Sequence, residues 1–454
     1  MFDKKSFSTD IYNGVKPLHF LGQLVGLAPY FYVRNTQTGE ESIDISSRSN
    51  VKKIIWALVL LVVQITGLSF KIAGSIINPP DSIMDLVNDV IQFPFFGATS
   101  TVAITLAVTI NRKKMLLFLH TLSVIDKVLF PKRNIYKKQQ IQLLIAVACT
   151  SVVSAVIFYL DIYYYYTYNL LYIITIYVPD FVWSVNELQF MNLVEVLRVR
   201  LVTLNARICT VFASDSYMQD ASRSTRKRNV QRAGRLVSVP HAVGSNYTKH
   251  PRRRQTCKEF LGDIIEISCG ESKITSRILK LRKIYNNLYE MCCLINTMYG
   301  YMLLQEFTSY AVCMIVDGYN LICFLVAIYK SEDPMVPPEG YPALILWNLS
   351  NLIRPFLLCL SCQKLNNEFK TTLKSIQTLE LQSDVKIGVS DQLRQFSSQV
   401  QNCKMGFSAC GFFDINLSLF CAVVLTATTQ ITVLVLLDRQ TEMTFRLSPS
   451  SSPL

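Results

Sequence analysis

The stretch CGFFDINLSLFCAVVLTATTQITVLVLLDRQ, residues 410–440, decides which kind of fold this chain can adopt. It is apolar over most of its length, and about 20 apolar residues in a helix cover the hydrocarbon core of a bilayer. Polar side chains interrupt it, namely Gln430 and the hydroxyl-bearing Ser418, Thr426, Thr428, Thr429 and Thr432. Such groups are unfavourable in lipid. They therefore predict contact with a neighbouring helix or with water in a pore.

Similar apolar segments recur along the 454 residues, half of which are hydrophobic. The pattern predicts an all-α polytopic membrane protein with seven transmembrane helices, since a soluble core would not need so many long apolar runs. The N-terminus, MFDKKSFSTDIYNG, lacks an apolar region followed by a cleavage site, so we expect no removable signal peptide. The expected spans are 54–77, 86–110, 141–163, 169–193, 300–329, 342–363 and 411–437.

The net charge of +13 is distributed unevenly between the connecting segments. Of the 45 Lys and Arg residues, 40 lie in alternate segments and only 3 in the segments between them. The positive-inside rule places the basic segments in the cytoplasm, so the N-terminus is expected inside and the C-terminus outside. This orientation is the reverse of that of a G-protein-coupled receptor. The distribution also indicates a lipid bilayer, and no nucleic acid, as the partner of the basic charge.

Three of the four cytoplasmic segments, 1–53, 194–299 and 364–410, are expected to differ in structure. The middle of the long basic loop, 215–257, lacks apolar periodicity and is predicted to be a partly disordered insert attracted to anionic inner-leaflet lipid. Residues 273–299 and 364–405 carry apolar residues at helical spacing. We therefore expect helices that continue from the spans into an intracellular anchor bundle. The remaining divisions are the helix groups 54–193 and 300–363, helix 411–437 and an extracellular tail, 438–454.

Motifs for catalysis and cofactor binding do not occur in a plausible frame. The chain has no phosphate-binding loop, no dinucleotide fingerprint and no zinc-protease motif, so we expect no enzyme activity and no cofactor. The four histidines are scattered, which predicts no metal site. The cysteines lie in spans or basic segments, which disfavours a disulfide framework because the cytosol keeps thiols reduced. The CLSC motif at 359–362 is best interpreted as small core residues.

Two motifs resemble the insect chemoreceptor superfamily. KPLHFLGQLVGLAPY (16–30) resembles the lead into its first span, and SACGFFDINLSLF (408–420) resembles the start of the seventh span of insect gustatory receptors. The resemblance implies ligand-gated cation channels that assemble as homotetramers or heterotetramers in the plasma membrane of sensory dendrites, with the seventh helix around a central pore. It also implies that a small-molecule tastant binds among the other helices.

One departure from the family pattern bears on ligand type. The family has Thr-Tyr, five hydrophobic residues and Gln-Phe late in the seventh helix. Here the matching positions are Thr429-Gln430, ITVLV and Leu436-Leu437. This departure favours a divergent receptor for bitter plant compounds. The alternatives are an odorant receptor subunit of the same superfamily and a transporter, which the absence of internal repeats disfavours.

One stripe of the seventh helix collects small and hydroxyl-bearing side chains, at about 100° per residue. We expect this stripe to line a non-selective cation pore, with a hydrophobic constriction near the outer mouth that gates by dewetting. The alternative is helix packing, in which each hydroxyl bonds the carbonyl four residues earlier. The predicted pore-lining residues are Ser418, Cys421, Thr429, Thr432, Leu436 and Leu437.

The outer halves of the third to sixth spans are the expected ligand site. Aromatic walls with a few polar groups are what small-molecule sites require. Asp317 could receive a cationic ligand or pair with Arg354, and we favour the ion pair because an unpaired charge inside the membrane is costly. The predicted ligand-binding residues are Tyr166, Trp183, Asp317, Trp347 and Asn348.

Overall fold

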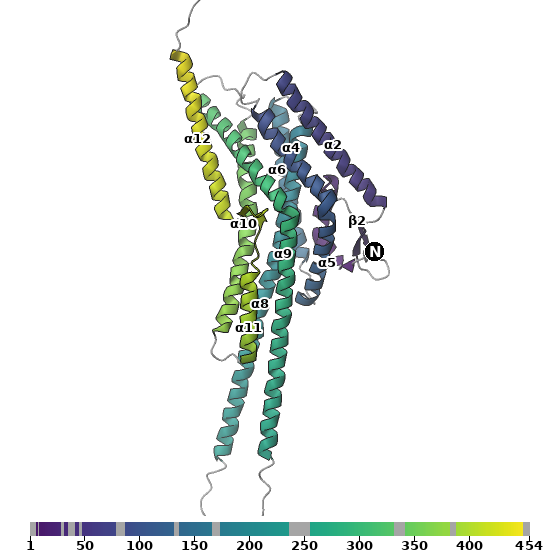
Figure 1. The fold of residues 1–454 in the computed structure, drawn as a ribbon, viewed down its shortest axis with the longest axis vertical. Helices are drawn as coiled ribbons and strands as arrows, with labels where there is room; N and C mark the ends of the chain where they lie inside the picture. Colours follow the sequence, from purple (N-terminus) through teal and green to yellow (C-terminus); the bar gives the residue numbers. More distant parts are fainter. Residues whose placement is uncertain are drawn as a thin grey trace, which may run out of the picture. The chain divides into compact units, whose positions relative to one another are not determined.

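A computed structural model describes the chain at residues 6–7, 9–28, 31–34, 41–44, 48–78, 87–130, 136–165, 173–235, 255–330, 341–381 and 387–447. Most of these residues are helical (Figure 1). The chain forms two compact units. The first contains Met1–Leu197, Glu290–Asn366 and Gly406–Leu454, and the second contains Arg198–Tyr289 and Asn367–Met405.

The helices follow the apolar segments of the sequence. Three π-helical turns, η1, η2 and η3, continue directly into α-helices. The helical elements are α1 (Thr9–Leu24), α2 (Arg48–Ile77), η1 (Asn88–Gln92), α4 (Phe93–Leu106), η2 (Ala107–Asn111), α5 (Arg112–Leu129), α6 (Tyr136–Tyr165), η3 (Ile173–Tyr177), α8 (Val178–Arg235), α9 (Gln255–Lys330), α10 (Tyr341–Glu380), α11 (Ile387–Asn402) and α12 (Leu417–Leu447).

Six helical segments of the described chain are long and apolar enough to cross a membrane, and they overlap six of the seven predicted spans. The remaining predicted span, 169–193, falls partly outside the described residues and otherwise on η3 and the start of α8. The polar residues of that segment lower its hydropathy. The fold is that of an all-helical, multi-span membrane protein. The six segments are Val51–Ile77, Val90–Leu129, Tyr136–Tyr163, Ile274–Val326, Pro342–Glu380 and Leu417–Gln440.

Short strands near the N-terminus were not predicted from the sequence. β1 (Ser6–Phe7), β2 (Phe31–Arg34) and β3 (Glu41–Asp44) form an antiparallel sheet with β3 in the middle. In the longer pairing, Tyr32 lies opposite Ile43. The predicted cytoplasmic segment 1–53 therefore contains a helix and a small sheet.

A hairpin precedes α12, and it corrects the predicted start of the seventh span. β4 (Ser408–Ala409) pairs with β5 (Phe413–Asp414), and the turn between them holds Cys410 and Gly411 at φ 53° and 81°. The helix starts at Leu417 and not at 411, because the preceding residues are used by the hairpin. Asn416 caps the helix, since its Oδ1 accepts a hydrogen bond of 2.9 Å from the Leu419 amide.

The hairpin is held on α9 by specific contacts in the first unit. The Ser408 amide donates to Asn296 Oδ1 at 3.1 Å, and the Cys292 thiol lies 3.7 Å from the Gly406 carbonyl. Phe407, just before β4, packs against Phe190 of α8 with a ring centroid distance of 5.3 Å. The segment that leads into α12 is therefore fixed to α8 and α9.

The core of the first unit joins the end of α1 to several spans. Buried residues include Leu18, Ala57, Ile104 and Val185, contributed by α1, α2, α4 and α8. Gly26 allows the close approach behind α1: its φ is +80°, and a Cβ at this position would lie 3.2 Å from the Ala57 Cα. Gly26, at the end of the GQLVG stretch (22–26), thus serves close backbone packing.

The second unit is a helical bundle with its own core. The predicted periodicity in α9 is confirmed, since Ile278, Leu281, Ile284 and Leu288 are buried. In α11 the matching apolar face, Val389, Leu393, Phe396 and Val400, is also buried. Leu381, by contrast, lies just beyond α10 and is exposed, so the apolar periodicity of segment 364–405 does not extend to it.

Candidate functional site

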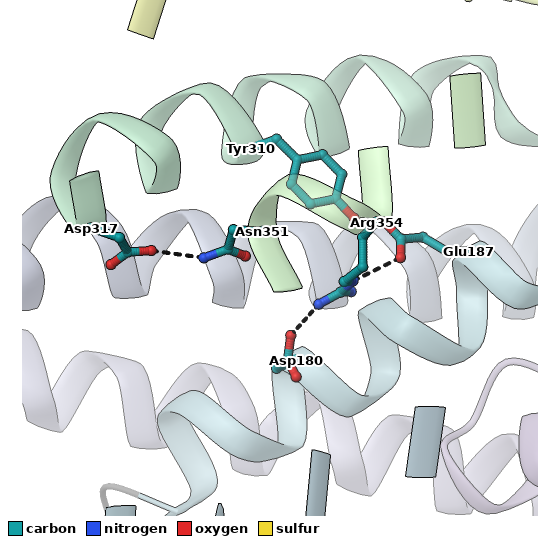
Figure 2. Close-up of polar contacts among 6 residues, drawn as sticks. All are labelled: Asp180, Glu187, Tyr310, Asp317, Asn351 and Arg354. Atoms are coloured by element: carbon teal, nitrogen blue, oxygen red, sulfur yellow. Dashed lines mark hydrogen bonds and ion pairs between the residues drawn. The ribbon is translucent and has the colours of Figure 1, made fainter. Parts of the chain in front are cut away.

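Arg354 is the centre of a polar network between α8 and α10 in the first unit. Its Nη1 lies 2.6 Å from Asp180 Oδ1 and its Nε lies 2.9 Å from Glu187 Oε2 (Figure 2). The Tyr310 hydroxyl of α9 donates to the other oxygen of Glu187. We call Asp180, Glu187, Tyr310 and Arg354 the Arg354 network. It joins three helices through side chains that are mostly removed from solvent.

An aromatic cluster lies against the Arg354 guanidinium. The Cζ atom of Arg354 is 4.6 Å from the ring centroid of Trp183 and 5.9 Å from that of Tyr310. Trp183 also contacts Tyr310 at 4.5 Å and Phe96 at 5.5 Å, and Phe96 contacts Trp347 at 5.8 Å. We call Phe96, Trp183, Tyr310 and Trp347 the aromatic cluster. Cation–π attraction adds to the ion pairs in holding Arg354 in place.

Asp317 is held by amides and not by Arg354. Gln92 Nε2 donates to Asp317 Oδ1 at 2.8 Å, and Asn351 Nδ2 donates to Oδ2 at 2.7 Å (Figure 2). The predicted Asp317–Arg354 ion pair is therefore wrong. Asn351 precedes Arg354 by three residues on α10, so it meets Asp317 while Arg354 reaches the two carboxylates of α8.

Pro355 helps to explain why these polar groups of α10 are available. It lies inside the helix and has no N–H to donate to the carbonyl of Asn351. A helix interrupted in this way needs neighbouring polar partners at membrane depth. The π-helical turns η1 and η3 similarly lie beside the site, since η1 ends at Gln92 and η3 ends just before α8. Such turns often occur at functional sites.

A further buried carboxyl group extends the site toward the middle of α9. Glu306 accepts a hydrogen bond of 2.8 Å from Asn186 Nδ2, and its second oxygen has no hydrogen-bond partner among the described residues. Ser309 and Thr99 exchange a hydrogen bond of 2.8 Å nearby on α9 and α4. The buried site therefore offers more carboxylate acceptors than the single guanidinium of Arg354 satisfies.

The structure brings together three of the five predicted ligand-binding residues. Trp183 and Trp347 belong to the aromatic cluster, and Asp317 is linked through Asn351 to the helix that carries both Trp347 and Arg354. Asn348 is partly exposed, and its Nδ2 donates to the Leu344 carbonyl of its own helix. Tyr166 lies outside the described residues.

Sequence reasoning did not identify Gln92, Phe96, Tyr310 or Glu306 as site residues. The sequence signal for Gln92 was an amide in a mostly apolar run, VIQFPFFG (90–97), directly before Phe93. The signal for Glu306 was its acidic side chain inside the predicted span 300–329. Phe96 and Tyr310 carried no distinguishing signal, because aromatic residues are common throughout membrane helices.

The two sides of α12 differ sharply in packing within the first unit. One side contacts its neighbours: Phe420 packs on Phe356 of α10 at 5.4 Å, Ala427 is buried, and Ile431 lies against Gly318 of α9. Ala427 is nine residues from Ser418, which at about 100° per residue places it on the opposite side of the helix. The side that carries the predicted pore stripe is exposed within the described chain.

Exposure of the predicted pore residues follows this division. All six, Ser418, Cys421, Thr429, Thr432, Leu436 and Leu437, are exposed. The Thr429 hydroxyl donates to the Leu425 carbonyl at 2.9 Å and the Thr432 hydroxyl to the Thr428 carbonyl at 2.8 Å. The hydroxyls thus satisfy their hydrogen bonds within the helix, and they still present oxygen atoms on its unpacked side.

The part of the chain that the structure describes contains no group of three or more His, Cys, Asp or Glu side chains arranged to hold a metal ion. Cys359 and Cys362 of the CLSC motif are buried free thiols on α10. Their position agrees with the interpretation of this motif as core residues.

These features define a multi-span membrane protein with a buried aromatic and polar site among its helices. The family model of 7tm chemosensory receptors matches residues 15–435. The chain belongs to the 7tm chemosensory receptor family. This is a family of receptors and not of enzymes, which confirms the expectation that the chain has no enzyme activity.

Solved structures of similar fold come from a receptor for odorants. The insect olfactory receptor OR5 from Machilis hrabei is 12% identical, with a TM-score of 0.58 over 92% of this chain and 97% of that chain. Its complex with eugenol is 10% identical, with a TM-score of 0.58 over 93% and 97% of the two chains. At this identity the likeness concerns the fold. A search of curated proteins found no match.

Proposed function

We propose that this chain is a gustatory receptor that acts as a ligand-gated, non-selective cation channel for bitter plant-derived compounds. Four copies, identical or mixed with related receptors, surround a pore lined by α12 in the plasma membrane of a sensory neuron. The observation that carries the proposal is the unequal packing of α12. Its apolar side packs on α9 and α10, whereas its hydroxyl-bearing side is exposed within the described chain.

The composition of the unpacked side supports water rather than lipid as its neighbour. Lipid-facing positions favour large apolar side chains, whereas Ser418, Thr429 and Thr432 present hydroxyl groups. Leu436 follows one turn later and is placed to form a hydrophobic constriction. The described stripe contains no acidic ring, which supports a pore that passes cations without strong preference for calcium.

The ligand site of this proposal is the aromatic cluster together with Asp317. Rings provide apolar walls, and the Asp317 carboxylate provides an acceptor for a hydroxyl or an amine of the ligand. Bitter plant compounds commonly combine such groups. The eugenol complex of the olfactory receptor OR5 is a small-molecule complex on the same fold, which supports a small organic ligand here as well.

Gating in this proposal is a shift between closed and open arrangements of the helices. A ligand shifts the equilibrium only by the difference in its affinity for the two arrangements. Helix α9 carries Tyr310 and Asp317 of the site and contacts α12 through Gly318. It is therefore the element through which a ligand would act on the pore helix.

The first experiment records currents from excised outside-out patches of cells that express only this chain. A panel of bitter plant compounds and sugars is applied without nucleotides. A ligand-evoked current supports a channel formed by this chain alone. Silence at confirmed surface expression contradicts a homomeric channel, and co-expression with related receptors then tests the heteromeric form.

Cysteine accessibility tests the pore assignment directly. In a Cys421→Ser background, Thr432→Cys places a thiol on the stripe, and Leu434→Cys places one at an exposed position on the side of α12 that carries Ala427. A charged methanethiosulfonate reagent should alter the current of the first variant and leave the second and the background unchanged. Equal modification of both variants would show that the stripe has no special access to water.

A further inference from the structure

An open, polar surface cavity lies between α9 and α11 in the second unit. Its volume is about 520 Å³, and its walls include Arg282 of α9 together with Asp391, Arg394, Gln395 and Ser398 of α11. The apolar face of α11 is buried in the core of the unit, so its opposite, polar face borders the cavity. Neither the aromatic cluster nor α12 is involved in it.

Arg282 is fixed in the cavity by neutral side chains. Its Nη1 donates to Gln392 Oε1 at 2.9 Å and to Gln395 Oε1 at 2.8 Å, and its Nε donates to Gln399 Oε1 at 3.2 Å. Its remaining nitrogen, Nη2, has no hydrogen-bond partner among the residues that the structure describes. The guanidinium is thus held in one orientation by glutamine side chains and forms no ion pair with a described carboxylate.

The same hydrogen bonds orient the glutamines. Each of the three uses its side-chain oxygen to accept from Arg282, which leaves its NH2 group as a donor. Gln395 and Gln399 line the cavity, so the wall around Arg282 presents donors rather than acceptors. The Ser398 hydroxyl can donate as well.

Arg394 supplies a second cation on the other helix. It is exposed, and within the described chain it forms no ion pair or hydrogen bond. Asp391 also borders the cavity and is the one acidic group in its wall. Two guanidiniums and several amide donors against one carboxylate make a cavity that favours an anion.

Other basic side chains lie on the same stretch of α9. Arg277, Lys280 and Lys283 are exposed, and helical spacing places them on other sides of the helix than Arg282. Such a basic surface raises the local concentration of anions and steers them toward the cavity. Guanidinium groups match phosphate oxygens in a two-bond geometry, which a simple halide cannot use.

We propose that this cavity binds an anion with several phosphate groups, bridging Arg282 and Arg394 and so tying α9 to α11. Because the two guanidiniums lie on different helices, two phosphate groups on one molecule match them better than a single phosphate does. Two sources share this chemistry: a soluble inositol phosphate and the headgroup of a phosphoinositide lipid. Occupancy would stabilise the second unit, because a ligand that binds only the folded state stabilises it.

The test is direct binding to the purified full-length receptor. One arm measures the affinity of inositol 1,4,5-trisphosphate for receptor in detergent. The other compares nanodiscs that contain phosphatidylinositol 4,5-bisphosphate with nanodiscs of equal charge made with phosphatidylserine. Binding in the first arm identifies a soluble anion as sufficient, and binding only in the second identifies the lipid headgroup. Binding in neither arm overturns the proposal.

Three variants separate a built site from general basic charge. Arg394→Gln and Arg282→Gln should each weaken binding at least tenfold. Lys280→Gln removes one charge from the same helix at an exposed position outside the cavity, and should change binding less than twofold. Equal losses in Lys280→Gln and Arg394→Gln would overturn the proposal. Arg394 is exposed and makes no described contact, so its variant should fold even where Arg282→Gln does not.

Discussion

Replacing Arg354 by Met should destabilise the first unit strongly. The guanidinium lies 2.6 Å from one carboxylate and 2.9 Å from another, in a region where Asp180 and Glu187 are buried. At an effective dielectric constant of about 20, each attraction is worth about 6 kcal/mol before desolvation is subtracted. Removing each of the three charged groups from water costs several kcal/mol, and this cost offsets most of the attraction. The intact network therefore contributes little net stability.

The single substitution nevertheless has a large effect, because it leaves two buried carboxylates without a cation. Removal of one partner from a buried pair typically costs about 3–5 kcal/mol. The loss of the contact between the guanidinium and Trp183 adds to this. We therefore expect Arg354→Met to lower the free energy of unfolding by about 3–5 kcal/mol, mostly through the stranded charges.

A triple variant distinguishes stranded charge from lost packing. Arg354→Met combined with Asp180→Asn and Glu187→Gln removes the guanidinium and both carboxylates together, and should recover most of the lost stability. The assay is thermal unfolding of the receptor in nanodiscs, followed by size-exclusion chromatography of the fluorescently tagged protein. If the triple variant is as unstable as Arg354→Met, the electrostatic reasoning fails. No loss in the single variant would refute the network itself.

Three further substitutions test local features by the same thermal assay. Gly26→Ala should lower the free energy of unfolding by about 1–2 kcal/mol, because residue 26 has a left-handed backbone conformation. Gly74→Ala is the control, since the space around Gly74 is open and this substitution should not destabilise the protein. Equal effects of the two substitutions would contradict the argument that Gly26 is required at its position. Asn416→Ala should cost about 1 kcal/mol by removing the cap of α12, and Asn416→Asp should restore it. Asp317→Ala should lower the free energy of unfolding by about 1–3 kcal/mol, because it leaves the buried amide groups of Gln92 and Asn351 without their acceptor. Asp317→Asn keeps one acceptor oxygen and should lower the stability less. Identical losses would show that the carboxyl oxygens do not satisfy those donors.

The apolar spans could be predicted because hydropathy is a local property of sequence. Composition alone identified six helical segments that the structure also contains. The start of α8 is harder to recognise, since Asp180, Asn186 and Glu187 lower the local hydropathy. The interior tolerates these residues because other helices supply their hydrogen-bond partners: Arg354 for the two carboxylates and Glu306 for Asn186. A window average cannot register a partner that lies more than a hundred residues away.

The hairpin before α12 shows a different limit of sequence reasoning. Two-residue strands give no alternating pattern, so periodicity could not reveal β4 and β5. Gly411 was a turn signal, but Cys410, also at positive φ, is a residue type that rarely adopts this conformation. The segment was therefore extended into the helix. Its structure depends on contacts with α9, such as that between Asn296 and Ser408, which are not local in sequence.

The partner of Arg354 could not be chosen from sequence either. Asp180, Glu187 and Asp317 all lie in predicted spans, and burial alone required only that the arginine meet some carboxylate. The choice depends on how α10 is rotated about its axis. Asn351 lies three residues before Arg354 and takes the place opposite Asp317, which directs Arg354 to α8.

The arrangement around Asp317 also bears on how a ligand at the candidate site could act on α12. Asp317 and Gly318 are consecutive on α9, and they face different neighbours. Asp317 binds side chains from η1 and α10, whereas a Cβ on Gly318 would lie 2.6 Å from the Ile431 Cδ1 of α12. One turn of α9 therefore contacts both the candidate ligand site and the packed side of α12. Because packed interfaces do not deform continuously, a ligand that displaced Asp317 would have to repack the contact between Gly318 and Ile431 as well.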